Sequence, residues 1–136
     1  MAVPSDIRDQ AYKLFIQEVP DLLHSIESDL LTLRQERNLT KIHNLMRNSH
    51  SIKGGAASVG LDEIATLAHR LENIFKALYS ESLEISTDLE SQLLQVYDCL
   101  RLPLMQQVTT GQFDVEQVRS TAEPIFAQVE KALGDI

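Results

Sequence analysis

Tryptophan is absent from the 136-residue sequence, aromatic residues make up only 5% of it, and a single cysteine is present. One cysteine excludes an internal disulfide framework, and the lack of paired cysteines is typical of a cytoplasmic chain. Cys99 lies within an apolar helical pattern, so we interpret it as an unreactive core thiol. With so few aromatic rings, the core has to consist of Leu, Ile, Val and Ala, which favours helices packed on helices.

Basic residues are also scarce, with 12 Lys and Arg against 20 Asp and Glu and a net charge of −8. This balance argues against nucleic-acid binding, which depends on neutralising phosphates with Lys and Arg. No apolar run approaches the ~20 residues that a membrane-spanning helix needs. The start of the chain also lacks the basic and apolar regions of a signal peptide. We therefore expect a cytoplasmic domain that binds neither nucleic acid nor membrane.

Strand-like alternation is missing throughout, whereas apolar residues recur at steps of three and four, as on one face of a helix. Pro20 interrupts the first helical segment, which we interpret as one kinked helix rather than two helices. Expected capping residues are Asn38 or Thr40, Thr87 with Glu90, and Asp114. The predicted helices cover residues 5–36, 40–59, 61–80, 87–109 and 114–133. They predict an all-α fold in a single domain, 1–136: an antiparallel four-helix bundle with a fifth C-terminal helix.

The segment "HSIKGGAASVG" places a histidine beside two glycines in the second predicted helix. A helical projection puts His50 on a flank, roughly 120° from the centre of the apolar face. Each glycine costs helix stability of order 1 kcal/mol relative to Ala. We expect Gly54 and Gly55 to leave open backbone where a partner approaches His50. The projection places two basic residues and one further small residue on the same side of the helix, namely Arg47, Lys53 and Ala57.

The third predicted helix carries His69 and Glu72, three residues apart on one flank. If the second and third helices form an antiparallel hairpin around Gly60, His50 and Glu72 lie at similar heights. A carboxylate there can accept a hydrogen bond from one imidazole nitrogen and leave the other as a nucleophile. His24 and His43 are better explained as solvated surface side chains.

Two classes of protein that do not use a nucleophilic histidine would also explain these features. A metal-binding bundle could use His43, His50 and His69 with nearby carboxylates, but a di-iron bundle needs two Glu-x-x-His steps and this chain offers one reversed step. A non-catalytic interaction module could use the same exposed helix face without chemistry. The combination of a flanking histidine, basic neighbours, glycines and a level carboxylate favours a nucleophilic histidine over a merely solvated side chain.

The stretch "HSIKGGAASVGLDEIATLAHRLENIF" resembles the histidine phosphotransfer (HPt) domain, of the type at the N-terminus of the chemotaxis histidine kinase CheA. The shared features are an H-S-[IL]-K-G-[GA]-[AS] stretch, a small-residue link ending in Gly, and an H-x-x-E step. The resemblance implies that His50 is phosphorylated and that Glu72 hydrogen-bonds to it. It also implies that Lys53 and His69 complete the polar site, with Gly54 and Gly55 allowing close approach.

The resemblance further implies a phosphorelay function. His50 would accept a phosphoryl group from an ATP-binding kinase domain and pass it to an aspartate of a response-regulator receiver domain. The chain has neither a G-x-x-x-x-G-K-[ST] loop nor a G-x-G-x-x-G loop before a helix, so we expect no ATP binding, cofactor or metal of its own. We expect the chain to belong to a larger CheA-like kinase and to be monomeric as an isolated domain.

Overall fold

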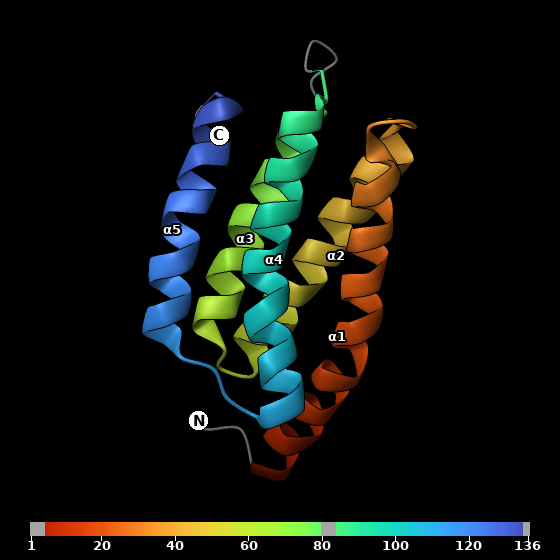
Figure 1. Ribbon diagram of the computed structural model, residues 1–136. Helices are drawn as coiled ribbons and strands as arrows, with labels where there is room; N and C mark the ends of the chain where they lie inside the picture. Colours follow the sequence, from red (N-terminus) through yellow and green to blue (C-terminus); the bar gives the residue numbers. More distant parts are fainter. Residues whose placement is uncertain (1–4, 80–83, 135–136) are drawn as a thin grey trace.

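The computed structural model describes residues 5–79 and 84–134, in which five helices and no strands are found (Figure 1). The expectation of an all-α fold is therefore confirmed. The first helix ends at Leu33 rather than at residue 36, and the third ends at Ala77. The predicted end of the third helix, residue 80, lies outside the described residues. The helices are α1 (Ser5–Leu33), α2 (Leu39–Ser58), α3 (Asp62–Ala77), α4 (Thr87–Thr110) and α5 (Val115–Ala132).

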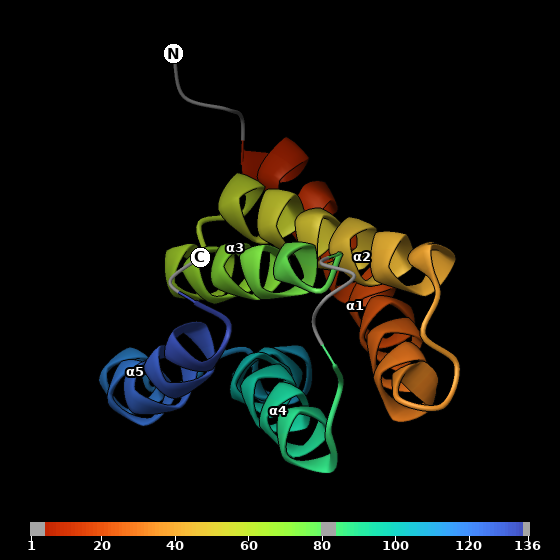
Figure 2. The ribbon, with the colours of Figure 1, turned by 90° about the horizontal axis from the view of Figure 1, so that it is seen from above.

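The first four helices form a ring in which each contacts its neighbours, and α5 lies outside this ring against α3 and α4 (Figure 2). Among the described residues, α2 contacts α1 and α3 and neither α4 nor α5. The expected four-helix bundle with an added fifth helix is thus the observed arrangement. It leaves one side of α2 facing away from the bundle.

Short polar side chains begin three of the helices. Asn38 Oδ1 accepts a hydrogen bond of 2.9 Å from the Lys41 N–H, and Asp114 Oδ1 accepts one of 3.1 Å from the Gln117 N–H, as the sequence predicts. The predicted capping residue Thr87 is wrong by one position, because Ser86 Oγ accepts the hydrogen bond from the Leu89 N–H instead.

Pro20 lies inside α1, which continues through it as one helix from Ser5 to Leu33. Proline removes one backbone hydrogen bond and leaves a carbonyl on the preceding turn without its usual donor. Pro20 itself lies on the exposed side of α1. The alternative of two separate helices meeting at Pro20 is therefore wrong.

The buried face of α2 matches the sequence pattern, with Ile42, Leu45, Ser49, Ile52 and Ala56 all buried. The apolar spacing predicts the buried face of α1 less well. Ile7 and Leu14 continue that spacing, but they are 53% and 57% exposed. Phe15, which belongs to the same apolar pattern, is buried, and Leu14 lies about 100° around the helix from it.

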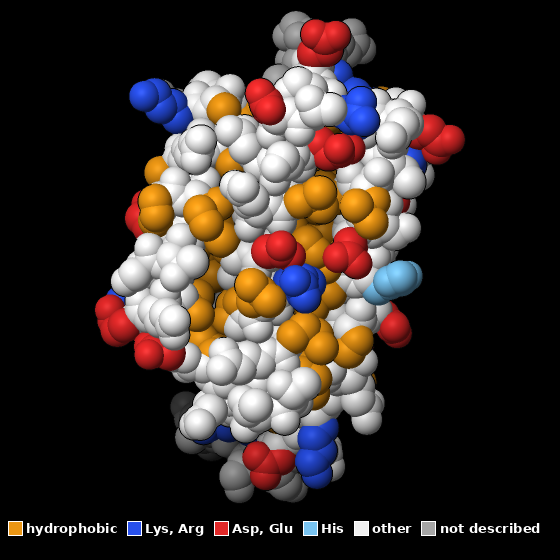
Figure 3. Space-filling view, viewed as in Figure 1, with side chains coloured by type: hydrophobic (Ala, Val, Ile, Leu, Met, Phe, Trp, Pro, Cys, Tyr) orange, Lys and Arg blue, Asp and Glu red, His pale blue; other side chains and the backbone are white. Residues whose placement is uncertain are grey.

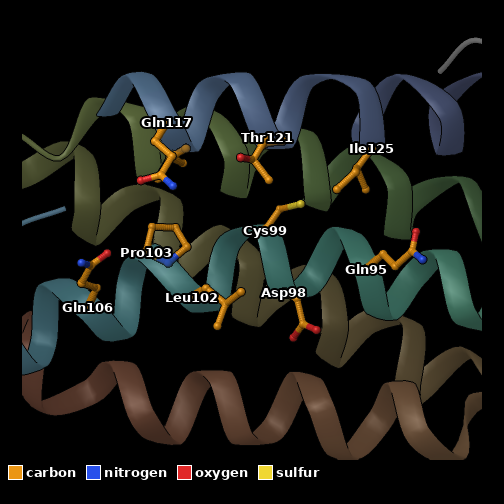
Figure 4. Close-up of a pocket in the computed structure, with 11 residues that line it drawn as sticks. Gln95, Asp98, Cys99, Leu102, Pro103, Gln106, Gln117, Thr121 and Ile125 are labelled. Atoms are coloured by element: carbon orange, nitrogen blue, oxygen red, sulfur yellow. The ribbon is translucent and has the colours of Figure 1, made fainter. Parts of the chain in front are cut away.

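A groove of about 630 Å³ runs between α4 and α5 on the side of the bundle away from α2. Hydrophobic side chains gather along this seam (Figure 3). In Figure 4, Cys99 and Pro103 point toward α5, whereas Asp98 and Leu102 point away from it. Cys99 is only 9% exposed, and burial raises the pKa of its thiol, which agrees with an unreactive core position.

Ion pairs fasten α5 to α3. The Arg70 guanidinium donates hydrogen bonds of 2.6 and 3.1 Å to the two carboxylate oxygens of Glu130 and one of 2.6 Å to Glu123. It also lies 4.9 Å from the centre of the buried Phe126 ring. These hydrogen bonds raise the pKa of Arg70, so its charge is held firmly at the contact between the two helices.

The two glycines of α2 have different surroundings. A Cβ atom added to Gly55 would lie 2.7 Å from Cε1 of the buried Phe15 ring, so α1 and α2 approach closely because this residue has no side chain. A Cβ atom added to Gly54 would have no atom within 4 Å. Packing therefore requires glycine at position 55 only.

This difference predicts opposite stability effects for two matched substitutions. Gly54→Ala should raise the free energy of unfolding by up to about 1 kcal/mol, because Ala favours the helix and meets no obstacle. Gly55→Ala should lower it by about 1–3 kcal/mol, because the buried ring has to shift. Urea denaturation followed by circular dichroism measures both, and a stabilising effect of Gly55→Ala would contradict the packing described here.

Candidate functional site

The turn between α2 and α3 sets which side chains of these helices face one another. Gly60 has a φ of +82°, a left-handed conformation that glycine adopts without strain, and it reverses the chain after α2. His50 lies ten residues before this turn and Glu72 twelve residues after it. The two side chains consequently lie at the same height, as the sequence predicts.

Glu72 joins the two helices through both of its carboxylate oxygens. His50 Nδ1 lies 3.2 Å from Oε2, and Lys53 Nζ donates a hydrogen bond of 3.1 Å to Oε1. A carboxylate only accepts hydrogen bonds, so the hydrogen bond from His50 requires the proton on Nδ1. Nε2 of the neutral ring then keeps its lone pair.

Burial differs among these three side chains in a way that suits nucleophilic chemistry. The His50 side chain is 64% exposed, whereas those of Glu72 and Lys53 are 19% and 28% exposed. The Glu72 carboxylate is therefore less exposed than the ring and holds one edge of it, and Lys53 in turn holds the carboxylate. The rest of the imidazole is accessible from solvent.

His69 is placed on the exposed side of α3, one turn before Glu72. Its Nε2 accepts a hydrogen bond of 3.5 Å from the side-chain amide of Asn73, four residues further along the helix. Within the described residues no hydrogen bond joins His69 to His50 or Glu72. Asn73 is absent from the sequence-based site, although its spacing of four from His69 is the signal that could have identified it.

The residues expected to allow a partner to approach fall into two groups. Arg47, Gly54 and Ala57 are exposed on the side of α2 that carries His50. Gly55 is half-buried and faces Phe15 of α1, so the structure gives it a packing role between helices. Of the two glycines, only Gly54 leaves open backbone beside the histidine.

The remaining histidines lie elsewhere. His24 is exposed on α1, and the His43 ring packs edge-on against the Tyr79 ring at 5.2 Å. Across residues 5–79 and 84–134, no group of three or more His, Cys, Asp or Glu side chains is placed to share a metal ion. None of the described helices has the length and hydrophobicity needed to cross a membrane.

Comparisons with known proteins agree with this geometry. The family model for the Hpt domain matches residues 10–105. The chain is 32% identical over 106 residues to the chemotaxis protein CheA of Klebsiella aerogenes, which covers 77% of this chain and 16% of that protein. It is 27% identical over 127 residues to CheA of Bacillus subtilis, covering 91% of this chain and 19% of that protein.

The chain thus spans less than a fifth of the length of these two relatives. A solved structure is also similar: the phosphorylated P1 domain of CheA3 in complex with CheY6 from R. sphaeroides. The TM-score is 0.74 at 22% identity, over 92% of this chain and 96% of that one, and this likeness shows a shared fold. Since the family model matches well over half of the residues, including the whole of α2 and α3, this chain belongs to the Hpt domain family.

Proposed function

We propose that this protein is a histidine phosphotransfer domain in which His50 carries the phosphoryl group. The observation that supports this most directly is the contact of His50 Nδ1 with Glu72, which occupies one ring nitrogen and leaves Nε2 free on an exposed ring. Lys53 shares the same carboxylate and keeps it in place. His69 is the fourth polar residue that we assign to the site, on the exposed side of α3.

The donor in this proposal is a separate ATP-binding kinase domain, and the acceptor is an aspartate of a receiver domain. The similarity to CheA proteins supports the donor. The chain matches only a small part of each of them, which leaves most of their length for other domains such as an ATP-binding kinase domain. The P1 domain of CheA3, which shares this fold, is phosphorylated and in complex with CheY6, which supports the acceptor. We infer that this chain works with, or within, a CheA-like histidine kinase.

The reaction follows from the position of the ring nitrogens. The Nε2 lone pair attacks the γ-phosphorus of ATP, the Nε2–P bond forms, and the P–O bond to ADP breaks. The ring keeps its proton on Nδ1 and becomes positively charged, which strengthens its hydrogen bond to Glu72. In the second transfer a carboxylate oxygen of the receiver attacks phosphorus, and the electron pair of the Nε2–P bond returns to Nε2.

The proposed site is complete within one chain, since α2 and α3 supply all of its side chains. We therefore propose that the domain acts as a monomer. We also propose that it acts in the cytoplasm, where ATP is available to the kinase. The side of α2 with Arg47, Gly54 and Ala57 is the surface that we assign to both partners.

Replacing the proposed nucleophile should abolish phosphorylation. His50→Gln should incorporate no acid-labile phosphate from radiolabelled ATP with the ATP-binding domain of a CheA kinase, nor from phosphoramidate, a small donor that needs no docking. His24→Gln, which changes an exposed histidine on α1, should be labelled like the wild type. Undiminished labelling of His50→Gln would refute the assignment.

Removing the carboxylate should slow the reaction without unfolding the domain. Glu72→Ala should lower kcat for phosphorylation by about tenfold or more, the value of one hydrogen bond between charged groups. KM for the kinase domain should change little, because Glu72 lies behind the exposed ring. Glu116→Gln on α5 is the matched control, and a wild-type kcat for Glu72→Ala would remove Glu72 from the mechanism.

A further inference from the structure

Arg47 differs from the other basic side chains of α2 in its partners. Lys41 pairs with Glu36 at 3.1 Å, and Lys53 pairs with Glu72 at 3.1 Å. Arg47 is exposed and forms no hydrogen bond or ion pair with any described residue. Its charge is therefore available to an anion that arrives from outside.

The direction of the His50 ring brings this charge to the reacting nitrogen. Nδ1 faces Glu72 on α3, and the two nitrogens of an imidazole point away from each other, so Nε2 points away from α3. The α1 side of α2 is marked by Asn48, whose amide donates a hydrogen bond of 2.9 Å to Ser25, and by Gly55. Arg47 lies about 60° around the helix from His50 toward that α1 side.

The basic side chains of α3 are not on the Nε2 side of the ring. His69 and Lys76 lie on the same flank of α3 as Glu72, which the ring faces with Nδ1.

We propose that Arg47 binds the phosphoryl group on Nε2 of His50, an inference that rests on the proposed phosphorylation of His50. A guanidinium group can donate two parallel hydrogen bonds to the oxygens of a phosphoryl group. Glu72, Lys53 and a neutral His50 sum to zero charge, and the ring gains one positive charge when it is phosphorylated. Arg47 supplies the second positive charge that a phosphoryl dianion requires.

The ionisation of phospho-His50 tests this directly, because a nearby cation favours loss of the proton that the phosphorylated side chain carries. The wild type, Arg47→Gln, Arg47→Lys and the remote control Arg101→Gln are each phosphorylated with phosphoramidate at low salt. Phosphorus NMR then follows the signal of phospho-His50 as a function of pH. Arg47→Gln should raise the midpoint by about half a pH unit or more, a threefold change in proton affinity.

The variants separate a phosphoryl-binding role from a general change in the domain. Arg47→Lys keeps the charge but not the paired donors, so its midpoint should lie between those of the wild type and Arg47→Gln. Arg101→Gln, whose side chain pairs with Asp98 on α4, should match the wild type. Equal midpoints in the wild type and Arg47→Gln would overturn the role of Arg47 alone. If His50 is labelled neither in the wild type nor in any of the variants, the proposed function is overturned as well.

Discussion

The antiparallel register of α2 and α3 is the constraint on which the site depends. Gly60 reverses the chain in a left-handed conformation, and this turn places Glu72 opposite both His50 and Lys53. A change in the length of this turn would rotate Glu72 off the flank that faces α2. Two other helices hold α2 and α3 in position. α1 packs against α2 at Gly55, and α5 is attached to α3 through Arg70.

Sharing one carboxylate between an imidazole and an ammonium group gives the two ring nitrogens different roles. Nδ1 is the nitrogen that faces Glu72 and donates to it, which leaves the lone pair on Nε2 of an exposed ring. Because Lys53 balances Glu72, the neutral site has no excess charge before the reaction. In the proposed reaction the charge change falls on the ring and on the phosphoryl group, beside the exposed Arg47 and Gly54.

The sequence predicts those features that depend on helical periodicity and spacing. The buried face of α2 follows from steps of three and four, and the similar heights of His50 and Glu72 follow from their distances along the chain to the turn at Gly60. Contacts between distant segments do not follow from such steps. The role of Gly55 depends on a ring from α1, and the exposure of Ile7 and Leu14 depends on where α1 meets the bundle. The attachment of α5 depends on Arg70, whose partners lie more than fifty residues away.

The tautomer of His50 is the most direct test of this account. A long-range proton–nitrogen correlation NMR spectrum of the unphosphorylated domain, recorded where the imidazole is neutral, reports which ring nitrogen carries the proton. The account predicts a proton on Nδ1 and an unprotonated Nε2 in the wild type, with this preference lost in Glu72→Ala. A spectrum in which Nε2 carries the proton while Glu72 is intact would contradict it.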